Sequence, residues 1–159
     1  MDNQQEKFSH KQLAVNCFNQ TWDLLDKRNR TQAEEEQMIH LCHTSFWHWT
    51  QVGEHTPQNL SIGYWQLARV YAVVENGEQA LNYAKQCVSV SHEADLAPFF
   101  IAYAYEAQAR AQLLLRQSTE AKKSLLLAEE FVQNIKDEES RKLVEADVSV
   151  LKGEIESKI

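Results

Sequence analysis

The sequence predicts an all-α protein, and two observations lead to that class. The 159 residues include 4 Gly and 2 Pro, where average usage would supply roughly 11 and 8. Sandwiches, barrels and doubly wound α/β folds need frequent turns, so this deficit argues against them. Apolar residues also recur every three or four positions along most of the chain, as they do in amphipathic helices.

Seven helices can be placed in order from their start and stop signals. Residues 1–8 are expected to form a flexible tail. The helices are then expected at about residues 9–27, 31–52, 57–75, 78–91, 98–115, 118–135 and 138–156. Connections this short imply antiparallel neighbours. We therefore expect one domain over residues 9–156, built of three antiparallel helical hairpins (9–52, 57–91 and 96–135) and a C-terminal capping helix (138–156).

The residues at the expected helix starts are ones that satisfy free backbone N–H groups or need none. Thr31-x-x-Glu34 has the spacing of a capping box. Thr56 precedes Pro57, and proline is favoured at the first helical position because its missing N–H costs nothing there. Ser118-Thr119 is expected to cap the sixth helix, and Asp137 the seventh.

The third helix carries apolar residues around nearly its whole circumference, which predicts burial by neighbours on several sides. Arg69 lies within this apolar belt, between Trp65 four residues earlier and Val73 four residues later. An unpaired buried charge would cost on the order of 3–5 kcal/mol. We therefore expect the Arg69 guanidinium to contact a carboxylate, an aromatic face or a ligand.

Charge and cysteine content exclude several functions. Sixteen Lys and Arg against 23 Asp and Glu give a net charge of −7, and no basic face for nucleic acid is evident. Cys17, Cys42 and Cys87 form no C-x-x-C pair, so neither a disulfide framework nor a zinc ribbon is expected. No apolar run is long enough to span a membrane or to act as a secretory signal. We expect a cytoplasmic protein without membrane or nucleic-acid partners.

A weak internal repeat relates residues that are 41 positions apart. Its matched residues are Tyr64, Ala68, Arg69 and Ala80 in the first copy, and Tyr105, Ala109, Arg110 and Ala121 in the second. Small residues such as these alanines let helices approach closely. Hairpins of this kind stack because a single one cannot bury its own apolar face.

The spacing resembles the tetratricopeptide repeat, W-x2-L-G-x2-Y followed by A-x3-F. The clearer copy reads Tyr64-x-x-Leu67-Ala68-x-x-Tyr71, followed by Ala80-x-x-x-Ala84. The period is 41 rather than 34, tyrosine replaces the signature tryptophan, and the closing proline is absent. The resemblance covers residues 60–130 and implies a right-handed array. The stretch over residues 43–72 also looks like bacterial proteins without an assigned activity.

This resemblance also implies a binding site, because the first helices of tetratricopeptide hairpins line a concave groove. The groove positions carried over to this chain are Trp22, Ile62, Trp65, Arg69, Tyr103, Glu106 and Arg110. We expect a non-catalytic scaffold that binds a protein or peptide, with arginine taking a carboxylate and tryptophan an apolar side chain. The same residues could instead satisfy one another, through a Glu106–Arg110 helix ion pair and a Trp65–Arg69 cation–π contact.

An alternative function is a small-ligand or metal-dependent pocket, with or without enzymatic activity. Its residues would be His43, His48, Trp65, Arg69 and Glu106, with Trp49 also on the rim. One helix cannot aim His43 and His48 at a single ion, so we assign no metal ligand. No phosphate-binding loop, dinucleotide fingerprint, nucleophile elbow or zinc-protease motif occurs, and we assign no catalytic residue or cofactor.

Self-association is the remaining expectation. Trp47 lies on the more polar side of the second helix, and an exposed tryptophan often marks a contact surface. The last helix ends a helical array, and such an end must be capped or paired. A homodimer could form through either surface.

Overall fold

A computed structural model describes residues 7–158, in which there are seven α-helices and no strand. The helices are α1 (His10–Leu25), α2 (Gln32–Gln51), α3 (Pro57–Val73), α4 (Gly77–Glu93), α5 (Pro98–Leu114), α6 (Ser118–Gln133) and α7 (Glu138–Ser157). The all-α class and the order of the helices are confirmed. Most of the tail expected over residues 1–8 lies outside the described residues.

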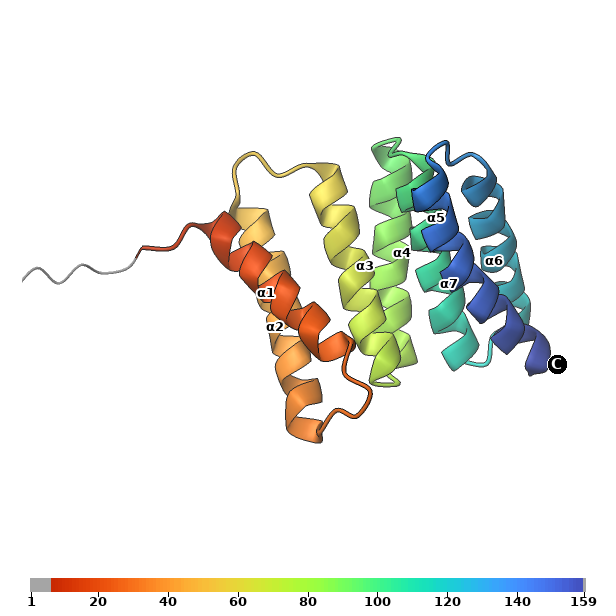
Figure 1. Ribbon diagram of the computed structural model, residues 1–159, viewed down its shortest axis with the longest axis horizontal. Helices are drawn as coiled ribbons and strands as arrows, with labels where there is room; N and C mark the ends of the chain where they lie inside the picture. Colours follow the sequence, from red (N-terminus) through yellow and green to blue (C-terminus); the bar gives the residue numbers. More distant parts are fainter. Residues whose placement is uncertain (1–6, 159) are drawn as a thin grey trace, which may run out of the picture. The chain divides into compact units, whose positions relative to one another are not determined.

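The helices group into two compact units that meet in sequence between His55 and Thr56. In the first unit, α1 packs against α2 as a hairpin. In the second unit, α3 pairs with α4 and α5 pairs with α6 (Figure 1). α5 also packs on both helices of the preceding hairpin, and α7 packs on α5 and α6. This packing of successive helices is compatible with a helical repeat. The expectation of a single domain over residues 9–156 stays a prediction.

Most predicted helix starts are formed by the expected side chains. The Thr31 hydroxyl accepts a hydrogen bond from the Glu34 N–H at 3.1 Å. Thr56 forms a reciprocal capping box with Asn59, and Pro57 is the first residue of α3. An Asp137 carboxylate oxygen caps α7 at its N-terminus in the same way. Local hydrogen bonding therefore sets these boundaries.

The turns that follow α3 and α5 share one backbone geometry. Glu75 and Arg116, 41 residues apart, adopt left-handed φ angles of 62° and 60°. In each turn the next N–H donates to the carbonyl five residues earlier at 2.9 Å, which is the long hydrogen bond of a Schellman motif. The turn leaves Gln117 as the N-cap of α6, without a side-chain hydrogen bond. The cap predicted at Ser118-Thr119 is therefore wrong.

The most extensively buried helix is α5, rather than the α3 helix that the apolar pattern singled out. α3 is buried on several sides as predicted, but α5 packs against α3, α4, α6 and α7. Close approach on so many sides is possible because α5 presents small buried side chains: Ala102, Ala104, Ala107, Ala109 and Ala111. A pattern search that looks for large apolar residues overlooks these alanines because they are small.

α7 closes the core of the second unit with one apolar stripe. Its buried residues are Val144, Val148, Leu151 and Ile155, as the sequence spacing predicts. They form one hydrophobic cluster with apolar residues of α5 and α6, among them Ala109, Leu125 and Val132. α7 therefore sits on α5 and α6 in the way that α5 sits on α3 and α4.

Candidate functional site

The candidate site centres on Glu106, whose side chain is 0% exposed in the middle of α5. Arg110, one turn later on the same helix, donates to Glu106 Oε1 through Nε at 3.0 Å and also through Nη2. Arg69 of α3 donates to the same oxygen through Nη2 at 3.4 Å. Trp65 of α3 donates its indole N–H to Oε2 at 3.4 Å. We call these four residues the Glu106 cluster.

The cluster surrounds the buried Glu106 carboxylate with hydrogen-bond donors. A buried carboxylate is tolerated only when it is paired and hydrogen-bonded, and here both of its oxygens accept bonds. The Arg69 and Arg110 side chains remain 20% and 19% exposed. Two guanidiniums share this one carboxylate, and Glu154 and Asp147 of α7 add negative charge close to Arg110. The guanidinium N–H groups of Arg69 and Arg110 that do not bind Glu106 therefore lie at the edge of solvent.

Aromatic rings line the cluster on the α3 and α5 sides. The Arg69 Cζ atom lies 5.1 Å from the centroid of the Trp65 ring, which is a cation–π distance. Trp65 also makes an edge-to-face contact with Tyr103, with centroids 5.4 Å apart. Both internal contacts that the sequence suggested, Glu106 with Arg110 and Trp65 with Arg69, are confirmed.

α7 adds acidic groups that sequence reasoning missed. The Tyr103 hydroxyl donates to Asp147 Oδ2 at 2.9 Å. Burial raises the pKa of Tyr103, and the bond to the Asp147 carboxylate raises it further. Burial alone would lower the pKa of Arg110, but Glu106, followed by Glu154 and Asp147, raises it on balance. Asp147 directly precedes the buried Val148. An acidic residue beside an apolar stripe was the one signal in the sequence that could have pointed to Asp147.

The structure brings together five of the seven predicted groove residues. Trp65, Arg69, Tyr103, Glu106 and Arg110 form the contacts described above. Ile62 is half-buried on α3, one turn before Trp65 and Gln66. Trp22 lies on α1 in the first unit, where its ring contacts Phe18 edge to face at 6.5 Å.

The residues predicted to rim a pocket, His43, His48 and Trp49, all lie on α2 in the first unit. Burial, and then the charge of His40, lowers the pKa of His43. His48 Nδ1 lies 2.9 Å from Nδ1 of His10, a neighbour from α1 that the sequence did not indicate. Within residues 7–158 no three His, Cys, Asp or Glu side chains are grouped to hold a metal ion.

Two cysteines, Cys42 and Cys87, are buried. Burial raises the pKa of the Cys42 thiol to about 12 and that of Cys87 to about 11. The thiolate is the reactive form of cysteine, so neither side chain is suited to nucleophilic catalysis. Cys87 instead donates a hydrogen bond to the Ser61 carbonyl at 3.3 Å, which is a structural role between α4 and α3.

Two shallow hollows lie on the second unit, away from the Glu106 cluster. One, of about 340 Å³, lies between α3 and α4 and is lined by Tyr64, Lys85 and Gln86 among others. The other, of about 430 Å³, lies between α6 and α7, with Val132 and Val148 among its lining residues. Residues of the Glu106 cluster line neither hollow, so neither extends the candidate site.

Comparisons of the chain with protein-family models, with curated proteins and with solved structures found no match. No helix in the described part of the chain is long and apolar enough to cross a membrane.

Proposed function

We propose that this protein is a non-catalytic, tetratricopeptide-like scaffold that binds a protein or peptide segment on the face shared by α3, α5 and α7. One observation carries the proposal. A single buried carboxylate, Glu106, holds two partly exposed arginines, and the half-buried rings of Trp65 and Tyr103 lie beside them. Such a surface offers fixed charged donors next to apolar contact area, as peptide-binding sites do.

The assignment to a tetratricopeptide-like array is supported by the repeat. Arg69 and Arg110 hold equivalent positions 41 residues apart, and both donate to Glu106. The turns that follow their helices share the same Schellman geometry, as does the turn after α4. α3, α5 and α7 correspond to the first helices of successive hairpins, because each later one packs on both helices of the hairpin before it. The first helices are those that line the groove in this family.

The ligand chemistry follows from how the arginines are held. A guanidinium already fixed by Glu106 loses little freedom when it binds a second acceptor, and arginine binds carboxylates in two-point geometry. Trp65 and Tyr103 add apolar contact area. We expect a segment that carries an acidic side chain next to an apolar one. The net charge of −7 favours a protein partner over nucleic acid, and the unpaired cysteines favour a cytoplasmic location.

The proposal is tested with a displayed library of random peptides selected on the immobilised protein. Enriched peptides are resynthesised, and their affinities are measured for the wild type and for Arg69→Gln. This substitution removes the more weakly paired arginine and leaves Arg110 on Glu106. Loss of one charge-assisted hydrogen bond, about 1.5–3 kcal/mol, predicts binding about 10- to 100-fold weaker. Lys85→Gln, an equal change of charge on the exposed face of α4, should bind as the wild type does.

Three results would contradict the scaffold. The first is the absence of enriched peptides, and the second is equal affinities for the wild type and Arg69→Gln. The third comes from native mass spectrometry and elemental analysis of the purified protein. A co-purifying small ligand or metal that is lost in Arg69→Gln would establish the pocket alternative in place of the scaffold.

A further inference from the structure

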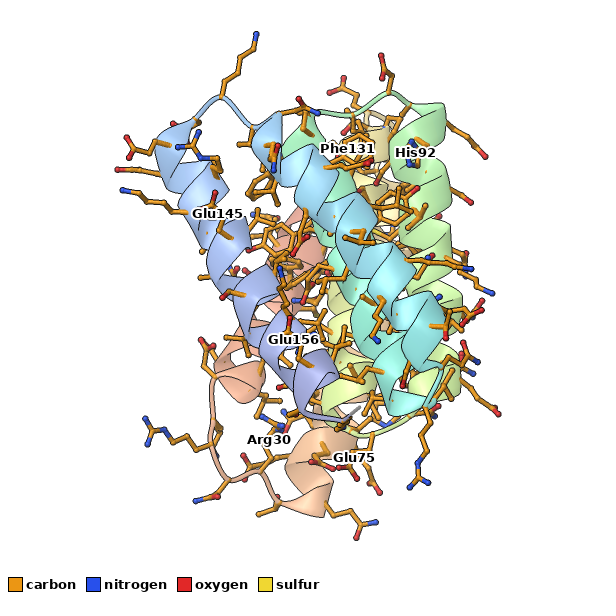
Figure 2. All side chains as sticks on the ribbon, turned by 90° about the vertical axis from the view of Figure 1, so that its right-hand side faces the viewer. Arg30, Glu75, His92, Phe131, Glu145 and Glu156 are labelled. Atoms are coloured by element: carbon orange, nitrogen blue, oxygen red, sulfur yellow. The ribbon has the colours of Figure 1, made fainter. Side chains whose placement is uncertain are left out.

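α7 carries a second apolar stripe that its own unit leaves uncovered. Leu143 and Val150 are 56% and 60% exposed. Ala146, which lies between them, and Gly153, which follows Val150, are exposed too. No atom lies within 4 Å of the position that a Cβ at Gly153 would take. Residues on a helix are about 100° apart, so this stripe lies roughly 150° around α7 from the buried one. In Figure 2, α7 is seen beside α6.

The spacing of this outer stripe is that of a helix–helix contact. Residues 143, 146, 150 and 153 follow at intervals of three, four and three, as the a and d positions of a coiled coil do. A helix that only covers a core needs one apolar stripe. The buried stripe around Val148 already meets that need, so core packing leaves the outer stripe unexplained.

Side-chain sizes favour a reversed copy of the same helix as the partner. If two α7 helices pair antiparallel about a point near Val148, Leu143 of one copy meets Gly153 of the second copy, and Ala146 meets Val150. Each large residue then faces a small one, and the two-fold axis repeats both layers. A parallel pair would place Leu143 on Leu143 and Gly153 on Gly153, which leaves a crowded layer and an empty one.

The charges on one flank of the stripe agree with this register. Lys142 and Glu156 lie on one flank, near opposite ends of α7, and Lys142 also pairs with Glu138 of its own helix at 3.0 Å. In an antiparallel pair, residues on the same flank of the two helices face each other, so Lys142 of each copy faces Glu156 of the other. Asp147 lies on the opposite flank, near the axis. Its carboxylate is turned toward α5 by the hydrogen bond from Tyr103.

We propose that the outer stripe of α7 is a homodimer interface, in which a second copy of this chain docks antiparallel across a two-fold axis. Four small apolar layers bury less surface than the roughly 1,200 Å² at the lower limit of standard interfaces. The dimer is therefore reversible, with a dissociation constant in the micromolar range or weaker. The interface does not depend on the peptide-binding function proposed above.

The test is sedimentation analysis of the full chain across micromolar to millimolar concentrations. We expect a monomer–dimer equilibrium for the wild type. Val150→Glu should weaken dimerisation at least tenfold, because it buries a charge in a central layer. Leu126→Glu is the matched control, since Leu126 is 61% exposed on α6 and lies outside the stripe. Thermal melts by circular dichroism show whether both variants keep the fold.

A charge exchange tests the antiparallel register. Lys142→Glu alone should weaken the dimer by placing like charges opposite each other, and Lys142→Glu combined with Glu156→Lys should restore it. Several results would overturn the proposal: a monomer at every concentration, a dimer that survives Val150→Glu, or a dimer that the double exchange fails to restore. A dimer lost in Trp47→Ala but not in Val150→Glu would place the interface on α2 instead.

Discussion

Trp65 and Glu106 are 41 residues apart in the sequence and meet in the structure, where the Trp65 indole N–H donates to Glu106 Oε2 at 3.4 Å. They hold equivalent positions in successive copies of the repeat. Stacking of the hairpins therefore brings corresponding residues of α3 and α5 face to face. The repeat thus builds the site itself, because it aligns Arg69 and Arg110 on the same buried carboxylate.

The first prediction concerns the buried charge. Glu106→Gln keeps the size of the side chain but removes the charge that Arg110 and Arg69 share. We expect the free energy of unfolding to fall by about 2–4 kcal/mol, somewhat less than the loss of a fully buried partner because both arginines reach solvent. Urea denaturation measures this change. Glu129→Gln, which breaks the partly exposed ion pair with Lys152, should cost less than about 1 kcal/mol, and equal losses for the two variants would refute the prediction.

The second prediction ranks the two arginines. Arg110 donates to Glu106 through two nitrogens, whereas Arg69 donates through one at 3.4 Å. Arg110→Ala should therefore lower the free energy of unfolding by about 3 kcal/mol, and Arg69→Ala by about 1 kcal/mol. Denaturant titrations of both variants under one set of conditions give the comparison. The reverse order would mean that the Arg69 contact with the Trp65 ring stabilises the fold more than the Arg110–Glu106 ion pair does.

The third prediction concerns alkaline pH. The pKa of Tyr103 is raised in the folded protein, first by burial and then by the hydrogen bond to Asp147. The folded state therefore keeps the phenol proton where an unfolded chain has begun to lose it near pH 10. This contribution to stability is complete below that pH and is lost as the pH rises above it. Tyr103→Phe lacks the contribution.

The measurement for Tyr103 is the free energy of unfolding from pH 8 to pH 11 for both proteins. At pH 8, Tyr103→Phe should be less stable by about 1 kcal/mol because Asp147 loses its donor. The wild type should then lose stability more steeply than the variant above pH 10. Tyr64 and Tyr105 titrate in both proteins, so their effects cancel in the difference. Parallel curves would show that Tyr103 does not contribute.

The fourth prediction compares two helical glycines. Gly153 is exposed on α7 with open space where a Cβ would lie, so Gly153→Ala should raise the free energy of unfolding by about 0.5–1 kcal/mol through helix propensity. At Gly77 a Cβ would lie 2.9 Å from Leu115 Cδ2 and 3.3 Å from Leu114 Cβ. Gly77→Ala should therefore destabilise by about 1 kcal/mol. Melts at low protein concentration, where the chain is monomeric, test both; a stabilising Gly77→Ala would show that Leu115 yields freely.

Local signals in the sequence were enough to place the helices. The Thr56 cap, Pro57 and the Asp137 cap act on backbone groups within four residues, so they operate in the same way in almost any tertiary context. The cap at Ser118-Thr119 was mispredicted because the turn that precedes it, with Arg116 in the left-handed region, fixes Gln117 as the N-cap. The 41-residue repeat relates this turn to the one after α3, where Glu75 adopts the same left-handed φ. The repeat therefore indicates the position of the α6 N-cap.

The sequence also showed that Arg69 needs a partner, but not which partner it has. That choice depends on which helices stack and at what register. The positions of Glu106, of Asp147 from α7, and of His10 beside His48 follow from packing between helices that are distant in sequence. Spacing along one helix determines which residues share a face, because the backbone period is constant. The residue on the opposing helix depends on how both surfaces fit, and only the folded chain specifies that fit.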